Sequence, residues 1–236
     1  MQSLKGKKAI ITGAGKGVGK AIAIALAKEG VELGLVARTM TNLPATVTEI
    51  SKYGVVHSAV ADVSNCDEIV KAIQYLQRQL GRVDILINNA GIASMGSTLD
   101  MDTAEWEKIF RVNVFGVYYV TKAILPHMIE NKAGDIITVA SSAGLRANAN
   151  AGAYSASKFA VIGFMESLMG EVRKHNIRVS TLMPSTIATD MSEELGIVKN
   201  GENIMQPEDL AEFVVHELKL DSRVFVKSAS LWGTNP

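Results

Sequence analysis

The sequence predicts an α/β fold in which a mostly parallel, seven-stranded sheet is covered by helices on both faces. The first observation is that short apolar runs alternate with longer amphipathic runs along the chain. Strands that alternate with helices favour a doubly wound parallel sheet. The second is the length, because 236 residues fit one such domain with a large core. We therefore expect a single domain over residues 1–236, without repeats, low-complexity tracts or an interdomain linker.

Seven runs of strand length and six runs of helix length define the expected elements. The expected strands are Lys8–Thr12, Glu32–Ala37, Val55–Ala61, Val83–Asn88, Asp135–Ala140, Arg178–Met183 and Arg223–Lys227. The expected helices are Gly19–Glu29, Thr41–Lys52, Cys66–Gln79, Ala104–Glu130, Gly152–His175 and Pro207–Leu218. The segment Pro184–Gln206 has no clean periodicity, so we expect it to be a loop.

Start signals support three of these helices. Ser64 with Asp67 three residues later is typical of a capping pair before the third helix. Asp102 and Glu105 could open the fourth helix in the same way. Pro207 suits the first turn of the last helix.

A glycine-rich turn follows the first expected strand. Thr12 leads into Gly13, and Gly17 and Gly19 come before an amphipathic helix. Glycines let the backbone turn sharply and approach a ligand closely. The free N–H groups and positive dipole end of the helix then favour a phosphate. The spacing differs from the common G-x-G-x-x-G, although Gly13-x-Gly15 begins that way.

Candidate ligand-binding residues follow six of the expected strands. In doubly wound sheets, ligands bind beyond the carboxyl ends of the strands. In strand order these residues are Gly13, Arg38, Asp62, Asn89, Ser141 and Pro184. Because the carboxyl ends of parallel strands lie at one edge, we expect all six to surround a single cofactor site.

Tyr154 and Lys158 lie four residues apart in an expected helix. Residues at this spacing share a face. An ammonium stabilises a neighbouring phenolate, so we expect Lys158 to lower the pKa of Tyr154 toward neutrality. Such a phenol can exchange a proton near physiological pH. Many helices carry this pair, so taken alone it is equally compatible with a solvated helix face.

Five motifs in this order resemble those of the short-chain dehydrogenases/reductases. They are Thr12-Gly13-x-x-x-Gly17-x-Gly19, Asn88-Asn89-Ala90-Gly91, Asn113, Ser141 and Tyr154-x-x-x-Lys158. The intervals are also similar, and the resemblance extends from Lys7 to about Phe225. It implies a Rossmann-type fold and an oxidoreductase that uses a nicotinamide coenzyme.

The resemblance implies which residues bind that coenzyme. In the family, an aspartate in the position of Asp62 contacts the adenine amino group, and a threonine matching Thr189 contacts the carboxamide. The full expected set is Gly13, Lys16, Gly17, Val18, Gly19, Arg38, Asp62, Val63, Asn89, Ala90, Gly91, Tyr154, Lys158, Ile187 and Thr189. Ser185 stands where the family usually has glycine, which leaves the local backbone path open.

The end of the second strand favours NADP(H) over NAD(H). An NAD site usually carries Asp or Glu there, which bonds the ribose and would repel a 2′-phosphate. This chain has Ala37 followed by Arg38, whose guanidinium suits a phosphate. Lys16 adds a second cation, and family members that prefer NADP resemble this pattern.

The resemblance also implies four catalytic residues, namely Asn113, Ser141, Tyr154 and Lys158. Tyr154 would give its proton to a substrate carbonyl oxygen that Ser141 polarises. Ser142 is adjacent and stays an alternative, although the interval to Tyr154 favours Ser141. Lys158 would stabilise the phenolate and bind the nicotinamide ribose. Asn113 would position a water that links the lysine to solvent.

Composition excludes several other classes. Formal net charge is zero, so nothing indicates a nucleic-acid or anionic-membrane partner. The four histidines are scattered, so we expect no metal site. Cys66 is the single cysteine, which excludes an internal disulfide and suits a reducing compartment. With no signal peptide or membrane-spanning stretch in view, we expect a cytoplasmic protein.

The substrate is less constrained. Apolar residues in the loop 185–206 would either line a flap over a medium-sized or acyl substrate or anchor the loop on the domain. They are Met191, Leu195, Ile197, Val198 and Met205. The layout is similar to that of 3-ketoacyl-acyl-carrier-protein reductases, in which Lys132 matches a basic position that meets the carrier protein. Gly170 replaces a common arginine, however, and Ser228–Trp232 is more similar to sepiapterin-reductase-like carbonyl reductases.

The expected helix Gly152–His175 is apolar on more than one side, so one side needs cover other than the sheet. Family members often pair through this helix and its predecessor, which implies a homodimer or homotetramer.

Two other functions are alternatives to an NADPH-dependent carbonyl reductase. A catalytically silent NADP-binding sensor or scaffold typically lacks the tyrosine or lysine, and a sugar-nucleotide epimerase or dehydratase needs a larger C-terminal domain.

Overall fold

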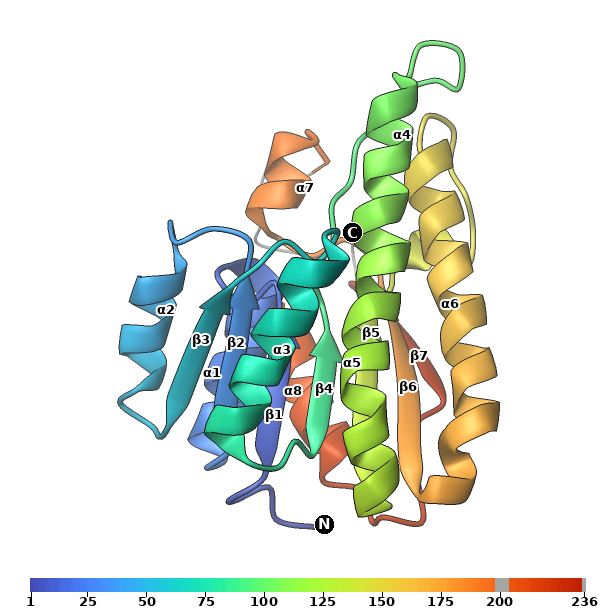
Figure 1. The fold of residues 1–236 in the computed structure, drawn as a ribbon. Coiled ribbons are helices and arrows are strands. Elements are labelled where there is room, and N and C mark those ends of the chain that lie inside the picture. Colours follow the sequence, from blue (N-terminus) through green and yellow to red (C-terminus); the bar gives the residue numbers. More distant parts are fainter. Residues whose placement is uncertain (198–203, 235–236) are drawn as a thin grey trace.

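The seven strands of the protein form one sheet in which every described pair is parallel (Figure 1). The computed structural model describes residues 1–197 and 204–234. The strands are β1 (Lys8–Thr12), β2 (Glu32–Ala37), β3 (Val56–Val60), β4 (Ile85–Asn88), β5 (Gly134–Val139), β6 (Ile177–Pro184) and β7 (Ser228–Leu231). Their order across the sheet is β3-β2-β1-β4-β5-β6-β7. The order reverses between β1 and β4, the place where doubly wound sheets bind ligands.

Helices cover both faces of the sheet. The described α-helices are α1 (Gly17–Lys28), α2 (Leu43–Ile50), α3 (Cys66–Leu80), α4 (Thr103–Phe110), α5 (Gly116–Asn131), α6 (Gly152–Val172), α7 (Asp190–Glu194) and α8 (Pro207–Leu218). One apolar core joins the sheet to α1, α2 and α8, and the other joins it to α3, α5 and α6. In Figure 1, α3, α5 and α6 lie in front of the sheet and α8 lies behind it.

The central strands are buried on both faces. In β1, Ile10 contributes to the core beneath α3 and α5, whereas Ala9 and Ile11 contribute to the core beneath α1 and α8. Successive side chains of a strand point to opposite faces, so a strand covered on both sides reads as a continuous apolar run. This burial is the reason that the sequence predicted the central strands, and it confirms the expected fold class.

The last strand lies later in the chain than expected. The apolar run Arg223–Lys227 was expected to pair, but β7 is Ser228–Leu231, which pairs with β6 from Thr181 onward. The expected run instead offers carbonyls to side chains of β6, because Ser180 Oγ donates to Val226 O at 2.6 Å. An edge strand of alternating small polar residues leaves little apolar signal to find.

Three helix expectations also need correction. The cap of α3 is Asn65 rather than Ser64, because Asn65 Oδ1 accepts from the backbone N–H groups of Asp67 and Glu68. The helix expected over Ala104–Glu130 is broken by a π-helical turn at Arg111–Phe115. The segment expected to be a loop contains the short helix α7. Asp102 does cap α4, accepting from Ala104 N.

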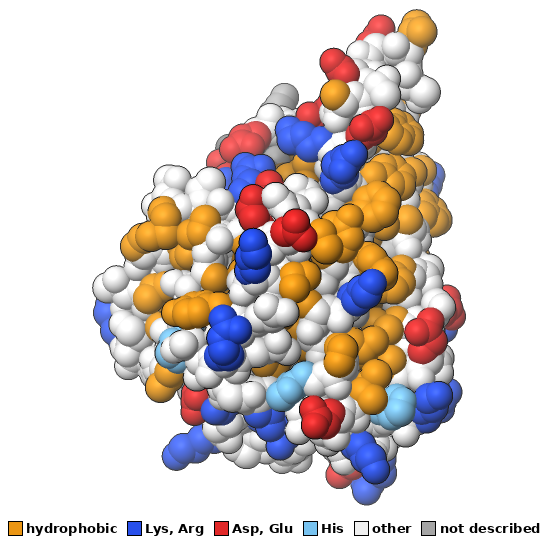
Figure 2. Space-filling model, viewed as in Figure 1, with side chains coloured by type: hydrophobic (Ala, Val, Ile, Leu, Met, Phe, Trp, Pro, Cys, Tyr) orange, Lys and Arg blue, Asp and Glu red, His pale blue; other side chains and the backbone are white. Residues whose placement is uncertain are grey.

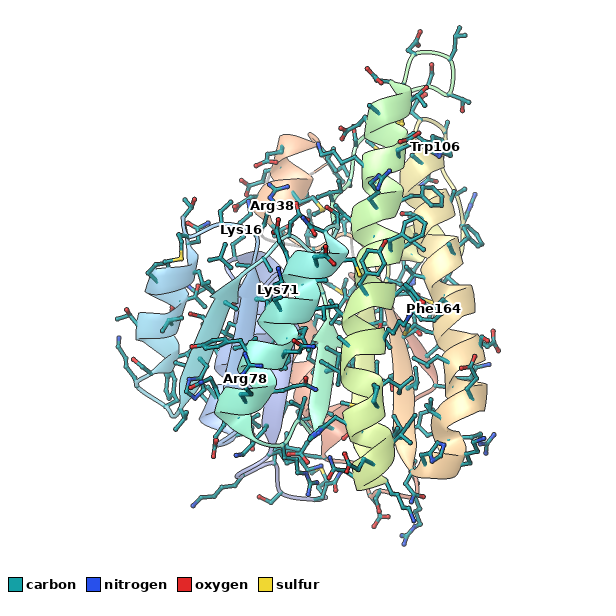
Figure 3. The ribbon with its side chains drawn as sticks, viewed as in Figure 1. Lys16, Arg38, Lys71, Arg78, Trp106 and Phe164 are labelled. Atoms are coloured by element: carbon teal, nitrogen blue, oxygen red, sulfur yellow. The ribbon has the colours of Figure 1, made fainter. Side chains whose placement is uncertain are left out.

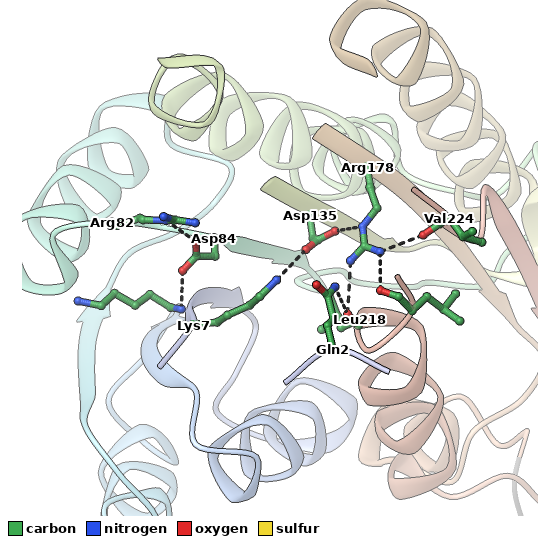
Figure 4. Close-up of polar contacts among 10 residues, drawn as sticks. Gln2, Lys7, Arg82, Asp84, Asp135, Arg178, Leu218 and Val224 are labelled. Carbon is green, nitrogen blue, oxygen red and sulfur yellow. Dashed lines mark hydrogen bonds and ion pairs between the residues drawn. The ribbon is translucent and has the colours of Figure 1, made fainter. Parts of the chain in front are cut away.

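Ion pairs fasten the amino-terminal edge of the sheet, opposite the expected site (Figure 4). Arg178 pairs with Asp135, and Lys7 lies 3.9 Å from the same carboxylate. Arg178 Nη1 also donates to Val224 O at 3.0 Å, which ties β6 to the chain that precedes β7. A partly buried guanidinium with several acceptors holds these segments in one register.

Glu217 of α8 is buried beside this network without a complete set of partners. Its side chain lines a small cavity with Asp135, Arg178 and Ser180, and its Oε2 has no hydrogen-bond partner among the described residues. Burial raises the pKa of Glu217 to about 7, and the neighbouring Asp135 carboxylate adds to this, although Ser180 and Arg178 oppose it. The native protein therefore favours a neutral Glu217.

None of the helices among residues 1–197 and 204–234 is both long and apolar enough to cross a bilayer. The expected cytoplasmic location stays a prediction.

The substitution Glu217→Gln should stabilise the protein more at pH 8 than at pH 5. In the unfolded chain Glu217 ionises near its ordinary pKa, so the native state bears a growing cost as pH rises toward 7. Glutamine removes that cost, and the gain at pH 8 should be on the order of 2–3 kcal/mol. Urea unfolding at the two pH values measures it. Glu212→Gln, on the exposed side of α8, is the control, and an equal effect of Glu217→Gln at both pH values would contradict the account.

Candidate active site

The glycine turn is packed directly against the end of β4. Gly13 has a φ of 67°, and a Cβ on it would lie 2.9 Å from Ala90 Cα and from Asn89 Nδ2. A Cβ on Gly19 would overlap the Gly13 carbonyl. These contacts require glycine, and they bring the turn after β1 and the turn after β4 together, as the sequence predicted.

Hydrogen bonds hold the two turns in this position. Thr12 Oγ1 accepts from the backbone N–H groups of Asn89 and Ala90, each at 3.1 Å. Asn89 Nδ2 returns hydrogen bonds to the carbonyls of Thr12 and Gly13 at 3.1 and 3.2 Å. Asn89 therefore braces the turn with its side chain, and the Thr12 hydroxyl is an organising group that the sequence analysis did not assign.

The amino terminus of α1 is free to receive an anion. No side chain in the described part of the chain caps it, and no acidic residue lies in its first turn. Its first residues are Gly17, which has a φ of 53°, and the partly buried Val18. Unpaired N–H groups and the helix dipole favour a phosphate at such an end.

Two cations, Lys16 and Arg38, lie beside this helix end, in the segments that follow the neighbouring strands β1 and β2 (Figure 3). Arg38 follows β2 and is exposed, and it is close enough to Lys16 to oppose the charging of that side chain. Lys16 Nζ lies 2.8 Å from Asp190 Oδ2, at the start of α7. This hydrogen bond raises the pKa of Lys16 and lowers the pKa of Asp190.

Asp62 and Val63 form the turn after β3. Asp62 Oδ1 accepts from the Ser64 backbone N–H at 2.8 Å and from the Ser64 hydroxyl at 2.7 Å. Val63 is buried, and it contacts the place where a Cβ on Gly116 would lie. The two residues thus stand at the carboxyl edge of the sheet, where the sequence predicted them, with one carboxylate oxygen of Asp62 used locally.

The π-helical turn places the Asn113 amide inside the protein. Asn113 is 1% exposed and forms a reciprocal pair with the backbone of Ile92, with both hydrogen bonds 2.9 Å long. Its Nδ2 also donates to Ser157 Oγ at 3.0 Å, and that hydroxyl donates to the Tyr154 carbonyl at 2.7 Å. Single π-turns often mark functional sites. Asn113 and Ser157 therefore join the turn after β4 to the start of α6.

Lys158 is buried at the meeting point of these elements. It is 7% exposed, its Nζ donates to Val139 O at 3.2 Å, and it lies 5.6 Å from the centroid of the Tyr154 ring. A Cβ on Gly91 would lie 3.6 Å from the same ammonium. Burial without a carboxylate partner lowers the pKa of Lys158 to about 8.

The expected effect of this ammonium on Tyr154 is wrong. Burial raises the pKa of Tyr154 above its usual value, and the hydrogen bond to the Ser141 side chain opposes that rise. The ammonium of Lys158 is directed to the Val139 carbonyl and is itself desolvated, so in the coenzyme-free protein its attraction for a phenolate does not offset the burial of Tyr154. Helical spacing predicted the proximity of the two side chains but not their burial.

Ser141 rather than Ser142 meets the tyrosine. Ser141 follows β5, and its hydroxyl interacts with Tyr154 and accepts from Ala143 N at 3.1 Å. Ser142 begins a short 3₁₀ turn that extends to Gly144. A Cβ on Gly144 would lie 2.9 Å from the Lys158 backbone carbon, so the turn packs closely on α6.

The segment after β6 closes the site from the other side. Thr189 caps α7 in a capping box with Ser192, and its Cγ2 would lie 3.4 Å from a Cβ on Gly17. Ile187 is buried and bridges to Met205. Ser185 has no positive φ and donates its backbone N–H to Leu231 O at 2.8 Å, so this position does not require glycine.

Of the apolar residues expected in this segment, Met205 anchors it, whereas Met191 and Ile197 are exposed and Val198 lies outside the described residues.

Residues 7–199 match the family of short chain dehydrogenases. The chain belongs to the short-chain dehydrogenase family. Its relatives include a 3-oxoacyl-[acyl-carrier-protein] reductase of Synechocystis, which is 37% identical over 215 residues that cover 90% of this chain and 85% of that protein. An uncharacterized oxidoreductase of Staphylococcus saprophyticus is 31% identical over 233 residues, covering 98% and 99% of the two chains.

A solved structure supports the same assignment. A metagenomic short-chain oxidoreductase in complex with NADP is 33% identical, with a TM-score of 0.87 and full coverage of both chains. As an oxidoreductase of this family, the chain has the fold that its sequence predicted, and the family binds nicotinamide coenzymes. The residues of this short-chain dehydrogenase fit such a group, because glycines leave room at two turns, α1 begins uncapped and two cations stand beside it.

The Lys158 ammonium of this short-chain dehydrogenase should titrate near pH 8. Lysine side-chain NMR of the coenzyme-free protein, followed between pH 6 and 11, should show one resonance with a midpoint near pH 8, below the ordinary lysine value of about 10.4. That resonance should disappear in Lys158→Gln and persist in Lys122→Gln, the control on α5. If every lysine titrates with a midpoint above 10, the ammonium is not desolvated as described.

Proposed function

We propose that the protein is an NADPH-dependent reductase that converts a ketone or aldehyde carbonyl to the alcohol. The observation that carries this proposal is the convergence of Ser141, Tyr154 and Lys158 at the carboxyl edge of the sheet, next to Gly91. A phenol bonded to a serine hydroxyl, with a buried ammonium behind its ring, is arranged for proton transfer to a carbonyl oxygen.

NADPH would supply the hydride. The uncapped end of α1 would bind the pyrophosphate, and the turn that contains Gly13 would let it approach the backbone. Lys158, next to Gly91, would hold the nicotinamide ribose and keep the coenzyme's reactive end near the phenol.

Tyr154 would give its proton to the carbonyl oxygen, which the Ser141 hydroxyl would also hold. Because burial raises the Tyr154 pKa, the protonated phenol is the resting form, which suits a general acid in the direction of reduction. The Lys158 ammonium would then stabilise the phenolate that forms. Asn113 would keep Ser157 and the Tyr154 backbone in place, and with a water it would complete the proton path.

Arg38 and Lys16 support NADP(H) as the coenzyme. Both are cations that would lie beside the adenosine ribose of the coenzyme. Ala37 supplies no carboxylate that would repel a 2′-phosphate. The metagenomic relative in complex with NADP supports the same choice.

A 3-ketoacyl thioester is the substrate class we favour, from the identity to the 3-oxoacyl-[acyl-carrier-protein] reductase of Synechocystis. Exposed Met191 in α7 and exposed Ile197 after it suit an acyl chain. Exposed Lys132 suits the acidic surface of a carrier protein, but Gly170 leaves the second expected basic position neutral. NADPH oxidation across ketones, aldehydes, diketones and 3-ketoacyl thioesters decides the class. NADPH binding without turnover of any of them would favour the catalytically silent sensor instead.

We also propose a homodimer or homotetramer built on one domain per chain. Aromatic side chains gather on the outer face of α5 and α6, where Figure 2 shows a hydrophobic stretch that runs along both helices. Phe115, Tyr118 and Phe159 are 47%, 39% and 47% exposed. Phe164, labelled on α6 in Figure 3, has its ring 6.1 Å from that of Tyr118. Contiguous exposed aromatics of this kind favour a partner.

The substitution Tyr154→Phe should lower the turnover rate by roughly 10²- to 10⁴-fold, since it removes the proton donor and little volume. NADPH binding, followed by coenzyme fluorescence, should persist. An unchanged rate would remove Tyr154 from its role.

The adjacent serines offer a matched pair for the same assay. Ser141→Ala should lower the rate because its hydroxyl meets Tyr154, whereas Ser142→Ala should leave it close to that of the parent protein. Equal losses in the two variants would contradict the assignment of Ser141.

The substitution Tyr118→Glu should convert the assembly to monomers, because it buries a charge in the proposed interface. Size-exclusion chromatography with light scattering measures the mass. Tyr53→Glu, which charges an exposed tyrosine after α2, should leave the assembly intact. A stable monomer of the parent protein would end the proposal.

A further inference from the structure

The short helix α7 presents two carboxylates to Lys16. Asp190 accepts a hydrogen bond from Lys16 Nζ at 2.8 Å. Glu194 lies four residues later, on the same face of the helix. Hydrogen bonding and charge from Asp190, and charge from Glu194, all act to raise the pKa of Lys16, whereas burial and the charge of Arg38 act to lower it. Two cations and two carboxylates therefore share one place at the edge of the site.

This contact joins two separate parts of the site. Lys16 is the N-cap residue of α1 in the glycine turn, and Asp190 is the first residue of α7, after β6. Gly17, which follows Lys16, and Thr189, which precedes Asp190, also lie close together, since a Cβ on Gly17 would be 3.4 Å from Thr189 Cγ2. The side chains of Lys16 and Asp190 are 55% and 62% exposed, so a ligand in solution can reach both.

We propose that Asp190 is a specificity-determining residue that competes with the 2′-phosphate of the coenzyme for Lys16. The inference rests on the proposed use of NADP(H), and it adds a residue that weakens the binding of the 2′-phosphate. A phosphate dianion that approaches Lys16 and Arg38 must share the ammonium with a carboxylate and also meets the charge of Glu194. A coenzyme without a 2′-phosphate does not meet this competition. Asp190 thus reduces the preference for NADP(H) over NAD(H) that the two cations create.

The consequence for binding has a definite sign. Asp190→Asn removes a negative charge from beside the phosphate site and frees Lys16, while an amide of nearly the same shape remains. Affinity for a ligand with a 2′-phosphate should rise about two- to fivefold, the range expected for one exposed ion pair. Affinity for a ligand without that group should stay constant. The gain should shrink as salt is added, because exposed charges are screened.

The test uses two probes that carry no nicotinamide ring, so it does not depend on turnover. Isothermal titration calorimetry compares adenosine 2′,5′-bisphosphate with adenosine 5′-monophosphate (AMP), which differs only by the 2′-phosphate, on the parent protein, Asp190→Asn and Glu193→Gln. Glu193 is the matched control, because it is the other acidic residue in the first turn of α7. Tighter binding of the bisphosphate alone, in Asp190→Asn alone, is the expected result. Equal changes for both probes, or no change, would overturn the inference.

A double-mutant cycle separates competition from a change in the shape of α7. In a Lys16→Met background, Asp190→Asn should lose most of its effect on the bisphosphate, because the contested ammonium is gone. A gain that is the same with and without Lys16 would overturn the inference, since Asp190 would then act by another route.

The two proposals fail differently. If the parent protein prefers the bisphosphate over AMP but Asp190→Asn does not strengthen the preference, the NADP(H) assignment stands and the role of Asp190 falls. If neither the parent protein nor Asp190→Asn distinguishes the two probes, both fall.

Discussion

The burial of one ammonium organises this site. Lys158 lies beneath the Tyr154 ring with the Val139 carbonyl as its acceptor, and burial lowers its pKa to about 8. A buried charge is costly unless polar groups surround it, so the elements around it must be held closely. The end of β5 provides the carbonyl, α6 provides the lysine and the tyrosine, and Gly91 leaves room beside the ammonium.

On the side of the site proposed for the coenzyme, close backbone approach holds the elements together. The turns after β1 and β4 touch at Gly13 and Ala90, and the Thr12 hydroxyl and Asn89 amide cross-link them. The π-helical turn continues the chain of contacts, because Asn113 bonds the backbone of Ile92 and the hydroxyl of Ser157. The proposed phosphate site at the glycine turn and the proposed proton donor on α6 are thus parts of one hydrogen-bonded assembly, which fixes their separation.

The sequence predicted most of the fold because parallel strands covered on both faces are apolar throughout. β1 and β2 were located to the residue for this reason, whereas β7, an edge strand of alternating serines, was misplaced. The π-turn was missed because nothing in the local composition separates it from an α-helix. The helix α7 was missed because five mostly polar residues carry no period that a sequence can show.

For the site, the residues expected to follow strands do lie at the carboxyl edge of the sheet, because the sheet fixes where each strand ends. Asn113, Tyr154 and Lys158 lie instead in a π-turn and in α6, and the roles of all these residues stay predictions. What the sequence could not supply was the environment. It gave the spacing of Tyr154 and Lys158 but not the burial that raises the pKa of the phenol. It also could not show that Lys16 is paired with Asp190, because the two lie 174 residues apart. Of the residues expected in the loop, Val198 lies outside the described ranges.

The central claim is that a protonated phenol stands beside the reactive end of a nicotinamide coenzyme. A crystal structure of the protein with NADP⁺ tests this most directly. The account predicts the nicotinamide ring within contact distance of the Tyr154 hydroxyl, its ribose on the Lys158 ammonium and the 2′-phosphate against Arg38. A ring turned away from Tyr154, or a coenzyme bound at any other edge of the sheet, would contradict it.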